Sequence, residues 1–218
     1  MLTISILCSS SDHPIMPFLD NWIKGKSKDH QINLCHSKKD LTGGDILFLV
    51  SCSEIVGANM RAAYRATLVL HASDLPVGRG WSPHIWSILE GAGQITVTLL
   101  EAEDEVDTGR IWQQVDFPVA EHMLWDEINA ALFEAELQLM DFAVAELDTI
   151  SPWPQPENVV PTYRQRRTAK DSSIDPNGTI ADQFNKIRIC DPARYPAFFE
   201  LHGHRYKLSL EKMDDPEN

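Results

Sequence analysis

The stretch from residue 66 to residue 114 constrains the fold of this chain more than any other part of its sequence. It opens with ATLVLH, an apolar and partly β-branched run that stops abruptly at polar residues. Such a run predicts a short buried strand, with His71 at its carboxyl end. Ligands of open α/β sheets bind beyond the carboxyl ends of the strands, so His71 is expected where a site would form.

A loop rich in turn residues and then a helix are predicted after this strand. Residues 72–81 contain one proline and two glycines. Ser82 and Pro83 predict the N-cap and the first turn of a helix, which Gly91 ends. The loop is therefore expected to form one wall of the site.

Two more strands are predicted next, ITVTLLE and RIWQQV, joined by the acidic loop AEDEVDTG at residues 102–109. Thirty-five residues separate His71 from Asp107, enough for a helix, a strand and a return. This loop could carry Asp107 back beside His71.

The remaining segments predict an α/β protein with a mainly parallel sheet. LTISILC, QINLCHS and DILFLVS read as strands, and PIMPFLDNWIK reads as a helix between the first two, an alternation that implies a Rossmann-like half. A long helix follows, with apolar residues spaced three and four apart from 124 to 145. Packing on the sheet is its default role, and a homodimer seam is the more speculative one.

A proline-rich boundary, SPWPQPENVVP, divides a predicted domain at residues 1–150 from a small C-terminal extension at 151–218. The extension holds the only dense basic run, YRQRRTAKD, and then a helix, a packing segment and a final short strand are expected. The basic run could bind an anionic substrate, or could equally be a solvated stretch.

Net charge and cysteine content limit the classes of partner and of site that the chain is expected to have. The net charge of −13 repels polyanions, which argues against nucleic acid as a partner. The four cysteines form no C-x-x-C pair, and no metal-ligand spacing is present, so neither a disulfide framework nor a metal site is expected. The N-terminus resembles neither a signal peptide nor a membrane span, which favours a cytoplasmic location.

The sequence resembles the 10-formyltetrahydrofolate-dependent formyltransferases, and most closely the bacterial sugar N-formyltransferases. The resemblance covers most of the chain from Asp45 onward, but only residues 71–109 carry specific motifs. The matching residues are His71, Ser73, Leu75, Pro76, Arg79, Gly80, Asp107, Thr108 and Gly109. The resemblance implies a Rossmann-like formyltransferase fold, 10-formyltetrahydrofolate as co-substrate and no metal. It also implies catalytic roles for His71 and Asp107, and a small nucleotide-activated amino sugar of surface-polysaccharide, O-antigen or nonulosonic-acid synthesis as acceptor.

Other site residues are implied by the same resemblance. The folate-binding candidates are Ser51, Cys52, Ser53, Ile55, Leu75, Ala102, Glu103, Asp104, Glu105 and Val106. The substrate-binding candidates are Ser73, Arg79, Gly80, Trp81, His84, Arg166 and Arg167. The acidic side chains at 103–105 are better read as a solvated turn, and Cys52 as a small buried residue. Trp81 and His84 could equally be ordinary residues of a helix that packs on the sheet.

One departure from the family pattern matters for activity. The asparagine that the family carries two residues before its histidine falls on Val69, which has no hydrogen-bond donor. Losing one oxyanion donor typically costs about 100- to 1,000-fold in rate. Either another group replaces it (His84, Trp81, Ser73 or a backbone N–H), or the alignment slips locally, or the chain is a weakened or silent relative. The favoured hypothesis is an N-formyltransferase; the alternatives are a formyltetrahydrofolate hydrolase and a silent folate-binding protein.

Overall fold

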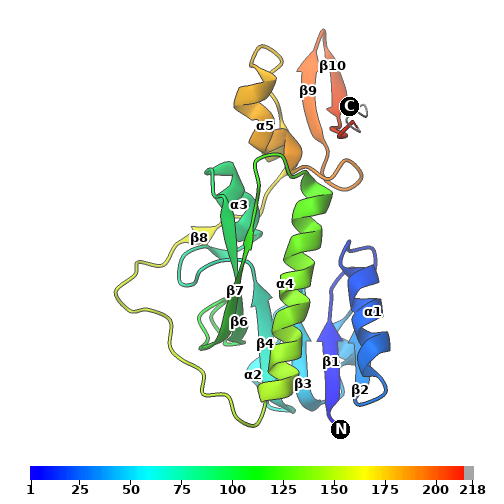
Figure 1. Ribbon diagram of the computed structural model, residues 1–218, viewed down its shortest axis with the longest axis vertical. Helices are drawn as coiled ribbons and strands as arrows, with labels where there is room; N and C mark the ends of the chain where they lie inside the picture. Colours follow the sequence, from blue (N-terminus) through cyan, green and yellow to red (C-terminus); the bar gives the residue numbers. More distant parts are fainter. Residues whose placement is uncertain (214–218) are drawn as a thin grey trace, which may run out of the picture.

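The computed structural model describes residues 1–213 and contains a six-stranded central sheet (Figure 1). The strand order is β2-β1-β3-β4-β6-β7, with β1 to β4 parallel and β6 and β7 antiparallel to their neighbours. The strands are β1 (Thr3–Leu7), β2 (Gln31–Cys35), β3 (Gly44–Leu49), β4 (Tyr64–His71), β6 (Gln94–Glu101) and β7 (Ile111–Pro118). The mainly parallel α/β sheet predicted from the sequence is confirmed.

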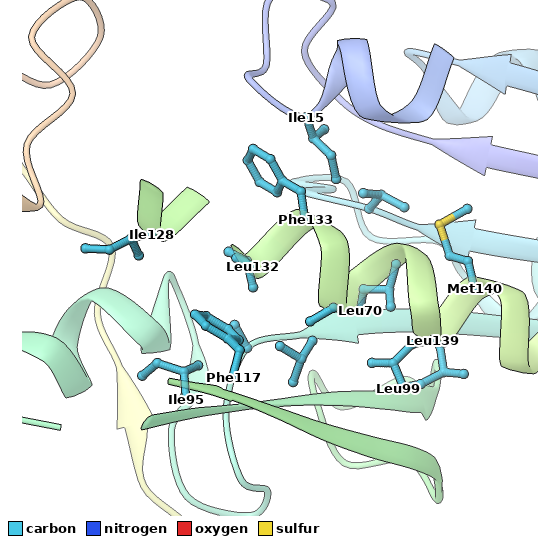
Figure 2. Close-up of a cluster of buried hydrophobic side chains, with 14 of the residues drawn as sticks. Ile15, Leu70, Ile95, Leu99, Phe117, Ile128, Leu132, Phe133, Leu139 and Met140 are labelled. Atoms are coloured by element: carbon cyan, nitrogen blue, oxygen red, sulfur yellow. The ribbon is translucent and has the colours of Figure 1, made fainter. Parts of the chain in front are cut away.

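Helices α1 (Met16–Lys26) and α4 (Trp125–Glu146) cover one face of this sheet (Figure 1). Figure 2 shows apolar side chains of α4, among them Leu132 and Leu139, pointing toward strand residues such as Leu70 and Leu99. The predicted apolar stripe of α4 therefore packs on the sheet, which is its default role. Short helical segments complete the first part of the chain: η1 (Lys38–Asp40), α2 (Ala58–Arg61) and α3 (Pro83–Leu89).

Strand β4 places the candidate site at the carboxyl edge of the sheet. Its residues 68 and 70 face α4, whereas Val69 belongs to apolar clusters on the opposite face. Side chains two apart in a strand share a face, so His71 lies on the same side as Val69, one step closer to the edge. The predicted helix after the loop is present as α3; Ser82 is its N-cap but adopts a left-handed conformation without a side-chain cap bond.

The segment after α4 reaches the edge of the sheet at β7 before it forms further structure. Trp153 pairs with Ile111 at the start of β7, and β8 (Tyr163–Arg164) pairs with β5 (Arg79–Gly80) in a separate two-stranded sheet. Then follow η2 (Ala169–Ser172), α5 (Ile180–Arg188), β9 (Ala197–Leu201) and β10 (His204–Leu208). The expected packing segment and final strand are thus two strands of one antiparallel hairpin.

Core residues of this C-terminal part, Ile174, Ile187, Ile189, Cys190 and Ala197, belong to the same apolar cluster as the central sheet. The division at residue 150 stays a prediction, and residues 214–218 of the expected extension lie outside the described part of the chain. Across residues 1–213, no helix combines the length and the apolar composition that a membrane crossing requires.

Candidate active site

His71 is buried at this edge of the sheet, with 6% of its surface exposed. Its Nε2 lies 2.9 Å from the carbonyl oxygen of Gly78. A carbonyl oxygen can only accept, so Nε2 carries a proton and donates it to this bond. The other ring nitrogen, Nδ1, lies 3.6 Å from Oδ2 of Asp107. The loop between β6 and β7 therefore brings Asp107 beside His71, as the sequence predicts.

Asp107 is held in an unusual backbone conformation. Its φ of 58° lies in the left-handed region, which costs a non-glycine residue free energy unless its surroundings hold it. Its Oδ2 accepts a hydrogen bond of 2.8 Å from the amide of Gly80. Two residues on, a Cβ at Gly109 would lie 1.9 Å from the carbonyl oxygen of Glu101, so only glycine lets the loop close at this point.

The loop between β4 and α3 is fixed by the returning C-terminal segment. Gly80 has a φ of 96°, and a Cβ there would lie 2.5 Å from the carbonyl oxygen of Arg164, its partner in β8. The amide of Gly78 donates to Oγ1 of Thr162 at 2.8 Å. The backbone at Gly78 and at Gly80 is therefore held by residues of the segment after α4, Thr162 and Arg164.

The two segments predicted to bind folate, residues 51–55 and residues 102–106, border one apolar cluster. Cys52, Val69 and Ala102 all pack on the buried group that contains Val56. Ile55 and Val106, one on each segment, expose 60% and 46% of their side chains. The apolar cluster between the two segments fits the flat face of a heteroaromatic ring.

Several side chains of these segments have other partners. Asp104 pairs with Arg61 at 2.8 Å, and Glu103 lies 4.0 Å from the same guanidinium, which fits the solvated reading of both. Glu105 accepts a hydrogen bond from the hydroxyl of Tyr163 at 3.0 Å. Burial raises the pKa of the Cys52 thiol, so the structure offers no activated thiolate there.

The other folate candidates differ in their exposure. Leu75 is only 1% exposed and forms a small apolar cluster with Leu100 and Ile111, against which Val69 packs. Ser51 and Ser53 are exposed, and Ser51 has a positive φ of 45°.

At the rim of the site, two arginines lie over aromatic rings. The guanidinium of Arg166 lies 4.8 Å from the ring centroid of Trp81, which is 41% exposed. Arg79 lies 5.8 Å from the ring centroid of Tyr163. Arg167 instead donates to the carbonyl of Asp171 and to the hydroxyl of Ser172, both at 3.3 Å. Of the two predicted basic residues, Arg166 is thus the one that joins the rim.

Two polar atoms without a hydrogen-bond partner within residues 1–213 belong to residues near His71. Nδ1 of His84 and Oγ of Ser73 are buried without a hydrogen-bond partner in the described part of the chain. Burial, and then the nearby charge of His71, lowers the pKa of His84 to about 4, so this imidazole is neutral. Both residues are candidates for the donor that Val69 lacks.

Sequence reasoning missed the residues that the C-terminal return contributes. Gln155 and Tyr163 contact both loops of the site, and Thr162 contacts the loop between β4 and α3. They lie in or just after a proline-rich stretch without periodicity, and no local pattern marks them. Within residues 1–213, no group of three or more His, Cys, Asp or Glu residues is arranged to hold a metal ion.

Known proteins are similar to this chain in sequence and in fold. Methionyl-tRNA formyltransferase of Rickettsia africae is 29% identical over 182 residues, which cover 83% of this chain and 58% of that protein. The chain thus spans less than two thirds of the length of such relatives.

Solved structures also share the fold, among them the following two. Methionyl-tRNA formyltransferase from Clostridium thermocellum superposes with a TM-score of 0.83 at 21% identity, covering 100% of this chain and 96% of the other. An uncharacterised protein from Mycobacterium tuberculosis, described as a likely sugar N-formyltransferase, gives a TM-score of 0.76 at 18% identity, covering 99% and 100%.

The sequence also matches the family model described as "Formyl transferase" over residues 24–144. This match includes β4, the loop with Arg79 and Gly80, and the loop with Asp107. Because it covers more than half of the chain, it establishes that this protein belongs to the formyl transferase family.

Proposed function

We propose that this protein transfers the formyl group of 10-formyltetrahydrofolate to the primary amine of a nucleotide-activated amino sugar. The observation that carries the proposal is the buried pair of His71 and Asp107, 3.6 Å apart, between two loops with glycines that have no room for a side chain. A shielded imidazole beside a carboxylate can exchange a proton with a reacting amine.

The donor would lie between the segments 51–55 and 102–106. Formyl transferases use 10-formyltetrahydrofolate as their donor. Here the apolar cluster around Cys52, Val69 and Ala102 supports the flat face of a pterin, and backbone groups of the loop 102–106 can bond its edge. The position of Val69 would bring the formyl group close to His71.

The transfer itself needs only proton movements and one tetrahedral intermediate. The acceptor nitrogen, as a neutral amine, attacks the formyl carbon, and the new C–N bond forms as the carbonyl electrons move to oxygen. Asp107, directly or through water, takes the proton from the attacking nitrogen. Collapse of the intermediate breaks the bond between the formyl carbon and N10 of the folate, which takes up a proton as it leaves.

His71 has to change partners to take part in this reaction. Its Nε2–H is bonded to the carbonyl of Gly78, so contact with the developing oxyanion requires ring rotation or a movement of that carbonyl. Nδ1 of His84 and Oγ of Ser73, both without a hydrogen-bond partner in the described part of the chain, are the candidates to fill part of the role of the asparagine that Val69 replaces. Polar groups preorganised in this way act on the oxyanion more strongly than water does.

Two features favour this acceptor class, the net charge of the chain and the pair of Trp81 and Arg166 at the rim of the site. A net charge of −13 disfavours a polyanion such as tRNA. The stacked Trp81 and Arg166 suit a nucleotide instead, because an indole stacks on a base and a guanidinium bonds a phosphate. The similar fold of a likely sugar N-formyltransferase is consistent with this acceptor class.

The test follows the release of tetrahydrofolate from 10-formyltetrahydrofolate. UDP- and dTDP-linked amino sugars are offered as acceptors, with methionyl-tRNA as a separate arm, and His71→Ala and Asp107→Ala are measured beside the parent. Turnover that depends on one amino sugar and disappears in both variants supports the proposal.

Three other results would overturn it. Turnover only with methionyl-tRNA would assign a different acceptor. Release of formate without any amine would indicate a hydrolase. Folate binding without turnover would make Val69 the mark of a silent relative.

A further inference from the structure

Gln155 reaches the candidate site through the return of the chain after α4. Its neighbour Trp153 exchanges two backbone hydrogen bonds with Ile111, of 2.8 and 3.0 Å, where β7 begins. A few residues later β8 pairs with β5. The segment is therefore attached on both sides of Gln155, which holds this side chain, half-buried, between the two loops of the site.

A single amide group joins those two loops. Nε2 of Gln155 donates to the carbonyl oxygens of Asp107, at 2.8 Å, and Gly109, at 3.0 Å. Its Oε1 accepts from Nη2 of Arg79 at 2.6 Å. Carbonyl oxygens only accept and a guanidinium only donates, so these partners fix which way the amide faces.

These contacts act on the part of the loop that most needs support. Asp107 has a positive φ of 58°, and such a conformation persists only where the surroundings hold it. The bond from Gln155 falls on the carbonyl of this same residue, and the second bond falls just beyond it. Gln155 thus bonds the backbone of the residue whose carboxylate accepts from the Gly80 amide and lies beside His71.

We propose that Gln155 is a positioning residue for formyl transfer, which sets the orientation of Asp107 relative to His71 and couples it to the loop of Arg79. It does this through three hydrogen bonds and does not touch the reacting atoms. The role rests on the proposed function, because it concerns the same pair of groups. A misplacement of about 1 Å can cost about 100-fold in rate, so loss of this support is expected to lower kcat.

The informative variant is Gln155→Glu, which keeps the shape of the side chain and its bond to Arg79. It replaces the donating NH2 by an oxygen that faces two carbonyl oxygens. We expect kcat to fall at least tenfold, while KM for 10-formyltetrahydrofolate changes less than threefold. The loss is expected to shrink toward acidic pH, because a protonated carboxyl can again donate. Gln155→Met, which can neither donate nor accept strongly, should lose activity at every pH.

Gln138→Glu is the matched control, since this exposed glutamine on α4 undergoes the same change of charge away from the site. Thermal unfolding is recorded for each variant. A second readout needs no turnover: the NMR titration of the His71 ring, assigned by its absence in His71→Asn. Its midpoint should move in Gln155→Glu and Gln155→Met but not in Gln138→Glu.

The two readouts separate this proposal from the proposed function. If the parent turns over no acceptor but the His71 midpoint still moves in both Gln155 variants, the coupling stands and the proposed function fails. If the parent is active and Gln155→Glu keeps its kcat with an unchanged His71 midpoint, the positioning role is wrong. An equal loss of kcat in Gln155→Glu at all pH values, explained by a matching loss of folded protein, would also overturn it.

Discussion

Oδ2 of Asp107 lies 3.6 Å from Nδ1 of His71, and the same oxygen accepts the Gly80 amide at 2.8 Å. The carboxylate thus joins the end of β4 to the loop that follows it. Its charge acts on the imidazole, and its hydrogen bond holds the loop. These two roles can be separated by a substitution that preserves one of them.

Asp107→Asn is expected to lower kcat at least 100-fold with little change in thermal stability. The amide oxygen of asparagine can still accept from Gly80, and asparagine tolerates the left-handed backbone at least as well as aspartate. The negative charge beside His71 is lost, as is the group that we propose takes the proton of the amine. Asp116→Asn, an exposed change on β7, serves as the control in the same steady-state assay. Retained activity in Asp107→Asn would remove the carboxylate from the reaction.

Val69→Asn tests whether the missing amide limits the rate. From position 69 an asparagine side chain would lie on the same face of β4 as His71. We expect kcat to rise about tenfold or more, because one oxyanion donor is worth about 100- to 1,000-fold when well placed. The gain should come with a loss of roughly 1 kcal/mol in stability, since an amide is placed in a partly buried position among apolar groups.

Val69→Leu is the control for that change, because leucine has the shape of asparagine without its polar atoms. Both variants are assayed well below their melting temperatures. Equal rates in the two would mean that another group, such as His84 or Ser73, already fills the role of the asparagine.

The sequence predicted the parts of the site that local patterns define. The apolar run that ends at His71 and the Pro and Gly residues after it mark a strand and a loop by themselves. The length of chain up to Asp107 allowed a return to His71, and the family resemblance paired the two. Neither β5 nor β8 could be predicted, because each is two residues long and exists only through pairing with the other. Gln155 was missed for the same reason, since its partners are distant in sequence.

The rim of Trp81 and Arg166 is expected to control acceptor binding and not the chemical step. Trp81→Ala and Arg166→Ala should each raise KM for the nucleotide sugar about tenfold and change kcat less than threefold. Arg166→Lys should give an intermediate value, because lysine keeps the charge but loses the flat surface that stacks on the indole. Arg205→Ala is the control, since Arg205 lies over Phe198 at 4.4 Å in the C-terminal hairpin. An unchanged KM in both rim variants would place the acceptor elsewhere.

The pKa shifts of three groups predict that the stability of the folded protein is greatest near pH 6.5. Burial lowers the pKa values of His13 and His84 to about 4, and burial on α4 raises the pKa of Glu136 to about 8. Below pH 6.5 the unfolded chain binds protons at both histidines that the folded chain does not, so acid lowers stability. From pH 4.5 to pH 8 the folded chain keeps a proton on Glu136 that the unfolded chain releases, so a rise in pH lowers stability.

Between pH 4.5 and 6.5 the two histidines outweigh the one glutamate, and above pH 6.5 only the glutamate acts, at about 1.4 kcal/mol per pH unit. Urea unfolding from pH 4.5 to 8.5 should therefore give a maximum with falling limbs on both sides. Glu136→Met keeps the volume of the side chain but removes the titrating group. It should flatten the limb above pH 6.5 and stabilise the protein more at pH 8 than at pH 5. An identical alkaline limb in Glu136→Met and the parent would show that Glu136 does not retain its proton in the folded chain.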